Sequence, residues 1–125
     1  PAVAAGDRAA GGGHVEIGET CADAVIREMQ EETGLTVVSP RLVGIKEWMK
    51  HGGQTRALVL CYEASAYTGT LTSSAEGENR WMTRAEIAAH PRGKSLLDFL
   101  PVYENPDVTS MFYAPDGDGW TAVYR

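Results

Sequence analysis

The chain has 125 residues and a formal net charge of -6 at pH 7. This length suits one domain, residues 1–125, that can bury a core without stabilising disulfides or structural metals. The acidic balance argues against a surface for nucleic-acid polymers or anionic membranes, because both bind basic patches. No apolar run of about 18 residues predicts a membrane span, and no signal peptide is visible. The two cysteines, Cys21 and Cys61, lack zinc-site spacing and fit a reduced cytoplasmic protein.

The first twenty residues predict little regular structure. Pro1 to Ala5 is a candidate edge strand, and Gly6 to Gly13 is a connection rich in glycine and alanine. His14 to Ile17 alternates polar and apolar residues, which predicts a short strand that ends in a turn at Gly18.

A helix is predicted from Cys21 to Thr33. Thr20 followed by Asp23 fits a capping-box-like start, and Gly34 is placed to close the helix in a left-handed conformation. One stripe of this helix is apolar and can be buried: Ala22, Ile26 and Met29.

Three glutamates lie on another face of the predicted helix. Glu28, Glu31 and Glu32 stand at i, i+3 and i+4, so their carboxylates are neighbours. Like charges at these spacings destabilise a helix unless a positive charge lies between them, and magnesium prefers carboxylate oxygens. Glu19 precedes the helix, beside its positive end, and Arg27 can pair with Glu31 or Glu28. The pattern therefore favours a metal-binding face over a merely solvated acidic helix.

The middle of the chain predicts a sheet. Thr36 to Val38 and Arg41 to Trp48 are rich in strand formers, and a turn follows at residues 50–54. Thr55 to Tyr67 contains the apolar run Ala57 to Tyr62, which predicts a central buried strand and an antiparallel hairpin with the preceding strand.

The C-terminal part alternates helices and strands. A polar loop beginning at Gly69 leads into a short strand that ends at Met82. Three further elements are predicted in order: a short helix capped by Thr83 that ends before Pro91, a helix over Lys94 to Tyr103 that Pro101 ends or kinks, and a hairpin of Ser110–Ala114 with Trp120–Tyr124.

The stretch from Gly13 to Leu35 resembles the Nudix box, G-x5-E-x7-R-E-U-x-E-E-x-G-U with U aliphatic, at every fixed position. The matching residues are Gly13, Glu19, Arg27, Glu28, Met29, Glu31, Glu32, Gly34 and Leu35. The resemblance implies an α+β fold, an α/β/α sandwich with a central mixed sheet. Family members usually carry a longer segment with a strand before the box. We therefore expect either a shortened domain or, in preference, residues lost between Gly6 and Gly12, because removing a central strand exposes an edge.

The resemblance also implies roles for the residues of the box. Glu28, Glu31 and Glu32 would be the metal ligands, and one of them would be a candidate base. Arg27 would orient the carboxylates, and Glu19 would be a secondary ligand or a support for the others.

Residues outside the box are assigned by the same resemblance. Many Nudix hydrolases carry a further glutamate in a loop before a Trp-containing strand, as metal ligand or base. Glu76 and Glu78 both match that placement, with Glu78 favoured because it is nearer the strand. Trp48, Trp81 and Arg80 are the candidate substrate contacts, with sheet packing an equal alternative for Trp48. For Arg80, which could reach a phosphate, the default alternative is a plain surface arginine.

The activity implied by the resemblance is magnesium-dependent hydrolysis of a nucleotide pyrophosphate, with manganese as a substitute metal. The sequence is most similar to small MutT-type nucleoside triphosphate pyrophosphohydrolases, including 8-oxo-dGTP diphosphatases. Hydrolysis of ADP-ribose or a nucleotide sugar is the alternative. A non-catalytic nucleotide sensor is disfavoured, because such domains usually lose glutamates that this chain keeps. The partner would be a small nucleotide, and a homodimer is compatible with the family.

Overall fold

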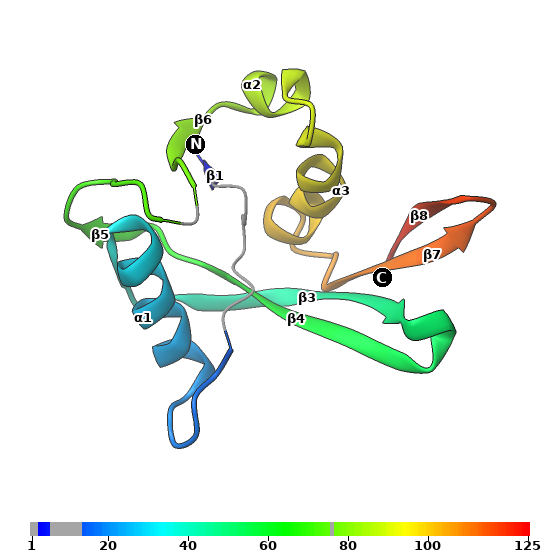
Figure 1. The fold of residues 1–125 in the computed structure, drawn as a ribbon, viewed down its shortest axis with the longest axis horizontal. Coiled ribbons are helices and arrows are strands. Elements are labelled where there is room, and N and C mark those ends of the chain that lie inside the picture. Colours follow the sequence, from blue (N-terminus) through cyan, green and yellow to red (C-terminus); the bar gives the residue numbers. More distant parts are fainter. Residues whose placement is uncertain (1–2, 6–13, 76) are drawn as a thin grey trace.

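The computed structural model describes residues 3–5, 14–75 and 77–125. Its elements follow one another along the chain as shown in Figure 1. They are β1 (Val3–Ala5), α1 (Cys21–Thr33), β2 (Thr36–Val38), β3 (Arg41–Lys50), the 3-10 turn η1 (His51–Gly53), β4 (Thr55–Glu63), β5 (Ala66–Thr68), β6 (Arg80–Met82), α2 (Arg84–Ala89), α3 (Gly93–Glu104), β7 (Ser110–Asp116) and β8 (Gly119–Tyr124).

The main sheet is mixed. In the described part of the chain its strand order is β4-β3-β7-β8, with β3 and β7 parallel and the two outer pairs antiparallel. Two smaller antiparallel pairs, β2 with β5 and β1 with β6, lie beside it. The predicted α+β class, a mixed sheet with helices, is confirmed, and so are the two predicted hairpins.

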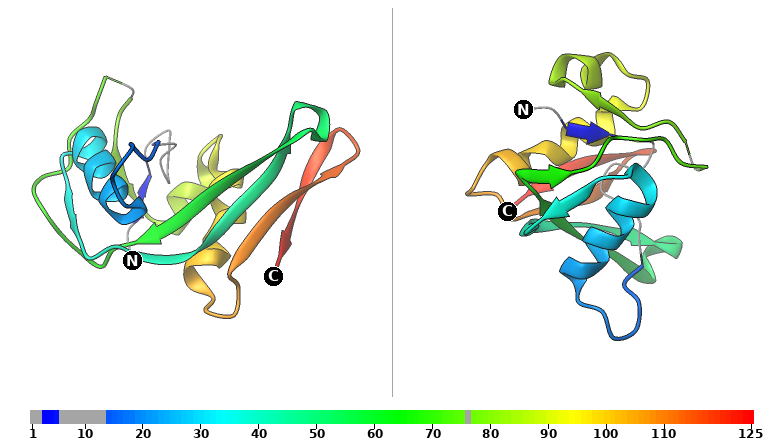
Figure 2. Two further views of the ribbon diagram at one scale, coloured as in Figure 1. Left: turned by 90° about the horizontal axis from the view of Figure 1, so that it is seen from below. Right: turned by 90° about the vertical axis from the view of Figure 1, so that its left-hand side faces the viewer.

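Helix α3 covers one face of the main sheet. It contacts β3, β4 and β7, and the two views of Figure 2 show it against the sheet. The buried side chains between them are Cys61, Phe99, Val102 and Met111. Burying a side chain the size of phenylalanine or methionine contributes about 1.5–3 kcal/mol, so this cluster is a principal source of stability. Pro101 lies inside α3 and does not end it.

The apolar run Ala57 to Tyr62 was predicted to be a central buried strand, and this prediction is wrong. In the described residues β4 pairs with β3 only and forms an edge of the sheet. Since α3 covers one face, every second side chain points to solvent, and Leu58 remains 54% exposed and Leu60 37% exposed. A continuous apolar run therefore does not distinguish a buried strand from an edge strand with one covered face.

The strand predicted at His14 to Ile17 is also wrong. These residues are exposed and irregular as far as the turn at Gly18, and the alternation has no neighbouring strand among the described residues to pair with. Local bonds hold the segment instead: the Glu16 amide donates to Glu19 Oε1 at 2.9 Å, and the Glu19 amide donates to the Glu16 carbonyl at 3.2 Å. The residues expected to be lost between Gly6 and Gly12 lie outside the described residues.

Helix α1 has the predicted bounds, Cys21–Thr33. Thr20 Oγ1 accepts a hydrogen bond from the Asp23 amide at 3.0 Å, and Gly34 ends the helix with φ 76°. The helix packs on β2, which directly follows it. Its two ends are thus fixed by the residues that the sequence indicated.

We expect Gly34→Ala to destabilise the fold more than the matched substitution Gly18→Ala. A Cβ at residue 34 would lie 2.8 Å from Thr72 Oγ1 and 2.9 Å from the Thr70 carbonyl oxygen, whereas one at residue 18 meets nothing within 4 Å. Both glycines have positive φ, so both variants carry about 1–2 kcal/mol of backbone strain, and crowding raises the total for Gly34→Ala to about 2–4 kcal/mol. Urea unfolding measures the difference. Equal free energies of unfolding for the two variants would contradict the packing.

Candidate functional site

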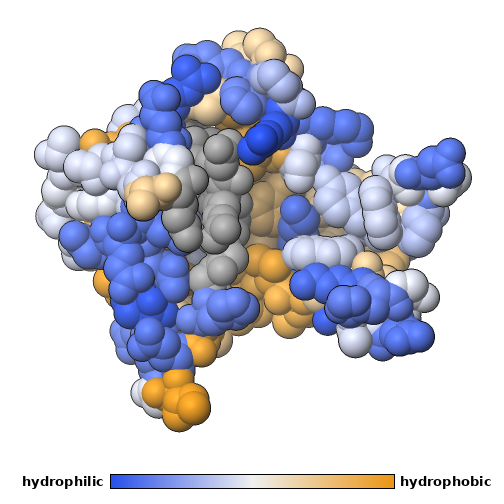
Figure 3. All heavy atoms as spheres, viewed as in Figure 1, coloured by the Kyte–Doolittle hydropathy of each residue, from blue (hydrophilic) through white to orange (hydrophobic). Residues whose placement is uncertain are grey.

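The glutamates of α1 lie along an exposed side of the helix, and the surface over α1 is largely hydrophilic (Figure 3). Arg27 lies among them. Its Nη1 donates to Glu28 Oε1 at 2.9 Å and approaches Glu31 Oε2 at 3.4 Å. The Glu28 side chain is 21% exposed and that of Glu31 59%. Pairing of Arg27 was predicted with Glu31 or with Glu28, and the structure has both ion pairs. Arg27 therefore offsets the repulsion between the carboxylates.

The other side of the Arg27 guanidinium binds the loop before the helix. Nε and Nη2 donate to the two oxygens of Glu19 at 3.1 and 2.8 Å, and Nη2 also donates to the His14 carbonyl at 3.0 Å. Hydrogen bonds from Arg27 and from the Glu16 amide lower the pKa of Glu19, and the bond to Glu19 raises the pKa of Arg27. Glu19 is thus held as a charged partner of Arg27.

The loop that carries Glu78 is bound to the C-terminal end of α1. Asn79 Nδ2 donates to the Glu32 carbonyl at 2.6 Å, and the Thr72 amide donates to the Thr33 carbonyl at 2.8 Å. Glu78, whose side chain is exposed, directly precedes Asn79. The structure therefore brings the favoured loop acid to the same end of α1 as Glu32, whereas Glu76 lies outside the described residues.

Carboxylates are the only candidate metal ligands at this end of the helix among the described residues, and their hard oxygens suit magnesium or manganese. No three histidine, cysteine or acidic side chains of the described segments are already arranged around one ion position. Arg27 contacts one oxygen each of Glu28 and Glu31. The second oxygen of each carries no hydrogen bond from a described residue, and it remains for a cation. The donor chemistry therefore fits a hard divalent ion.

The candidate substrate residues are dispersed. Trp81, on β6, lies with its ring centroid 5.4 Å from that of Tyr67, and the neighbouring Arg80 is exposed. Trp48 lies near the η1 end of β3, while α1 packs on β2 at the other end of that strand (Figure 1). The structure thus separates Trp48 from the glutamates of α1.

Trp48 lies on the sheet face that α3 covers. Lys46 Nζ is 5.6 Å from the centre of the Trp48 ring and 4.9 Å from that of Phe99 in α3. Burial lowers the pKa of this lysine. These contacts are those of half-buried sheet packing, which is one of the two roles expected for Trp48.

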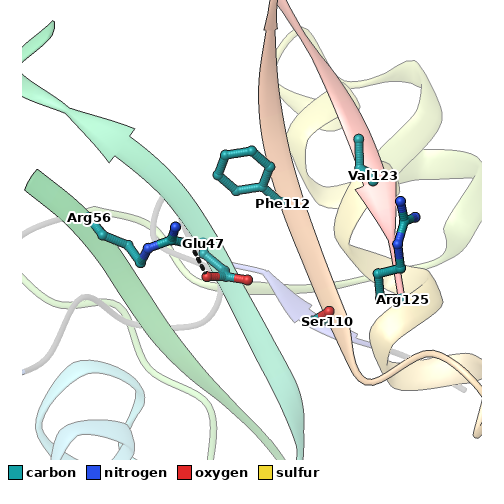
Figure 4. A pocket seen from close by; sticks show the side chains of 6 residues that line it. All are labelled: Glu47, Arg56, Ser110, Phe112, Val123 and Arg125. Atoms are coloured by element: carbon teal, nitrogen blue, oxygen red, sulfur yellow. Dashed lines mark hydrogen bonds and ion pairs between the residues drawn. The ribbon is translucent and has the colours of Figure 1, made fainter. Parts of the chain in front are cut away.

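A shallow depression of about 290 Å³ lies on the opposite sheet face. Figure 4 shows its lining: Glu47, Arg56, Ser110, Phe112, Val123 and Arg125. Glu47 forms an ion pair with Arg56, whose guanidinium lies 5.7 Å from the centre of the Phe112 ring. Sequence analysis did not single out these residues, because they come from different strands and share only the alternation that places them on one face.

Asn79 and Thr72 were missed as well. In the sequence they are polar residues of a polar loop, and nothing in that pattern distinguishes a residue that binds a helix end from one that binds water. One signal was available. A helix that ends at Thr33 leaves its last carbonyl groups without intrahelical partners, and side chains from elsewhere are among the groups that can satisfy them.

The mixed sheet and the glutamate-bearing helix with its closing glycine define a Nudix domain. A model of the NUDIX domain matches residues 5–103, and the chain belongs to this family. It is similar to the uncharacterized Nudix hydrolase YvcI of Bacillus subtilis (strain 168), with 33% identity over 96 residues, 71% of this chain and 61% of that protein. The chain thus spans about three fifths of that relative's length.

The fold is also similar to a known structure. The crystal structure of the mutator MutT protein from Bacillus halodurans matches with a TM-score of 0.65 and 24% sequence identity, covering 88% of this chain and 76% of that one. This likeness supports the fold. Among the described helices, none is long and apolar enough to cross a membrane.

We expect Arg27→Lys to lower the melting temperature by several degrees. Lysine keeps the charge but cannot donate in fork geometry to both oxygens of Glu19 while contacting Glu28. The matched control is Arg84→Lys, because Arg84 pairs with Glu104 through side chains that are both more than half exposed, and such pairs contribute little. Its melting temperature should fall by about 1 °C or less. Equal shifts in thermal unfolding would show that Arg27 is only a surface ion pair.

Proposed function

We propose that this chain is a magnesium-dependent pyrophosphohydrolase that cleaves a nucleoside triphosphate into the monophosphate and pyrophosphate by attack of water on phosphorus. The observation that carries the proposal is the pairing of Arg27 with Glu28 and Glu31 on α1. Glu32 follows on the same helix, and Asn79, the neighbour of Glu78, donates to the Glu32 backbone carbonyl. Family membership supports a diphosphate-containing nucleotide as the substrate class. A single domain over residues 1–125 and a homodimer remain part of the proposal.

The carboxylates would hold the metal ion. Glu28, Glu31 and Glu32 are the proposed ligands, and Glu19 and the loop acids Glu76 and Glu78 are the proposed secondary ones. A bound ion of this kind supplies positive charge to the pyrophosphate oxygens and makes a water molecule more acidic.

The chain's own residues supply the rest of the chemistry. One carboxylate, from α1 or from Glu78, accepts the proton that the attacking water loses. Arg27 orients two of the acids, since its guanidinium binds Glu19 through two bonds and reaches Glu28 with a third, and the bonds to Glu19 lower the pKa of that carboxyl group. Arg80 and Trp81 on β6 are the proposed contacts for phosphate and base. Trp48 is also proposed as a base contact, and a nucleotide bound at the glutamates of α1 would have to extend along β3 to reach it.

The proposed substrate is a canonical or oxidised nucleoside triphosphate such as 8-oxo-dGTP. The support is the likeness of the fold to the mutator MutT protein together with the complete glutamate set of the box. The test is a panel of canonical and oxidised triphosphates, ADP-ribose and dinucleoside polyphosphates with magnesium. Product is measured as phosphate after adding inorganic pyrophosphatase, and in parallel after alkaline phosphatase.

We expect pyrophosphate from at least one triphosphate, and a loss of about 10²-fold or more in kcat for Glu31→Gln and Glu32→Gln. The amide is isosteric but loses the charge that a metal ligand or base needs. Glu104→Gln is the matched control, because Glu104 is an exposed glutamate on α3 and should keep wild-type activity.

Other results would redirect the assignment. Signal from ADP-ribose alone would replace the triphosphate with a nucleoside diphosphate derivative. No turnover of any substrate by folded, metal-loaded protein would contradict the enzyme and leave nucleotide binding as the function to pursue.

Removal of the metal gives an independent prediction. Activity should vanish in EDTA and return with magnesium or manganese, because both are hard ions that accept carboxylate ligands. Circular dichroism of the EDTA-treated protein should stay unchanged, since the core cluster between α3 and the sheet contains none of the proposed metal ligands. Full activity in excess chelator would contradict the metal-dependent chemistry.

A further inference from the structure

The C-terminal end of α1 is completed by a distant loop. The last carbonyls of a helix have no partners within it. Here the Thr33 carbonyl accepts from the Thr72 amide at 2.8 Å and from Thr72 Oγ1 at 3.3 Å. The Glu32 carbonyl accepts from Asn79 Nδ2 at 2.6 Å. Thr72 and Asn79, which lie 39 and 47 positions along the chain from the carbonyls they bind, thus cap the end of α1. Residues directly after a helix more often supply such bonds.

Asn79 also closes the loop on itself. Its Nδ2 donates a second bond to the Thr72 carbonyl at 3.1 Å, and its amide donates to Ser73 Oγ at 3.2 Å. An asparagine amide nitrogen has two hydrogens, and here they serve two carbonyls, one on the helix and one on the loop. Aspartate has the same shape and neither donor.

The contact between the helix end and the loop is tightly packed. A Cβ at Gly69 would lie 2.6 Å from the Gly34 carbonyl oxygen, and one at Gly34 would lie 2.8 Å from Thr72 Oγ1. The loop therefore has little freedom to slide along the helix end. Hydrogen bonds and close packing fix the same relative position.

We propose that Asn79 and Thr72 are positioning residues that set the loop acid against the glutamates of α1. Glu78 immediately precedes Asn79, and Asn79 is bonded to Glu32, one of the proposed metal ligands. The hydrogen bond from the Asn79 side chain to the Glu32 carbonyl thus connects the residue next to Glu78 with a residue of α1 that carries a proposed metal ligand. The expected effect on metal binding and turnover rests on the proposed function, whereas the positions of Asn79 and Thr72 rest on the hydrogen bonds described above.

The test compares Asn79→Ala and Asn79→Asp with the control Asn105→Ala. Asn105 is the other asparagine of the chain, and it accepts a bond from the Asp107 amide after α3, away from α1. For each variant we would measure kcat, the magnesium concentration at half-maximal activity, and Mn²⁺ binding by electron paramagnetic resonance without substrate.

Loss of the two Nδ2 bonds should raise the half-saturating magnesium concentration and the Mn²⁺ dissociation constant, and it should lower kcat. The ratio of kcat to the half-saturating magnesium concentration should fall by about 10-fold or more. Asn79→Asp should be at least as severe, because it adds a negative charge beside two carbonyls at the negative end of the helix dipole. Asn105→Ala should match the wild type. Thr72→Val, which loses the Oγ1 donor and keeps the backbone bond, should give a smaller shift in the same direction, and Thr72→Ser should restore part of it.

A double-mutant cycle separates positioning from stability. In a Glu78→Gln background the effect of Asn79→Ala on metal dependence should largely disappear, because the acid that it positions is gone. An unchanged effect in that background would overturn the proposal, as would a lower melting temperature with wild-type metal dependence. If Asn79→Ala does not fold, the same cycle with Thr72→Val decides. If the wild type turns over no substrate in the panel, the proposed function fails, while the Mn²⁺ measurements still decide the positioning role. A wild type that binds no Mn²⁺ would overturn both.

Discussion

Repulsion among carboxylates on one face of α1 is the constraint on which the candidate site depends. Glu28 and Glu31 share a helix face, and Glu19 comes close to it from the preceding loop. Arg27 offsets this repulsion, because its planar group faces several carboxylate oxygens at once. The same contacts orient the acids. Charge compensation and preorganisation are therefore two effects of one side chain.

Helix α1 is held at its middle and at its C-terminal end by side chains with several donors. Arg27, its central residue, binds the loop at residues 14–19, and Asn79 binds its last turn to the loop at residues 72–79. Neither bond lies within the helix itself. Both loops are thus bound to the same rigid helix. Residues of the two loops are far apart in the sequence, and α1 fixes their relative positions.

Sequence reasoning succeeded where the decisive interactions are local. The bounds of α1 follow from Thr20 and Gly34, and the pairing of Arg27 with Glu28 and Glu31 follows from helical spacing. It failed where a tertiary neighbour decides. Ala57 to Tyr62 has the composition of a buried strand, but its burial depends on what lies beside β4. His14 to Ile17 has the alternation of a strand but no described partner. The bonds made by Asn79 and the face shared by Glu47, Arg56 and Phe112 depend on the fold, and no local pattern encodes them.

The loop closed by Asn79 has a consequence for how such a domain can diversify. Asn79 bonds Thr72, and the Ser74 and Gly77 backbones pair with each other, so the ends of the segment between residues 72 and 79 are fixed independently of its sequence. Changes in the length of a loop whose ends are already fixed cost little free energy, since closure entropy grows only slowly with length. Insertions between Ser74 and Gly77 therefore lengthen the loop at little cost to the fold, and they leave Ser73, Glu78 and Asn79 in place. The domain can thus change the size of this loop while it keeps the proposed loop acid on the same mounting.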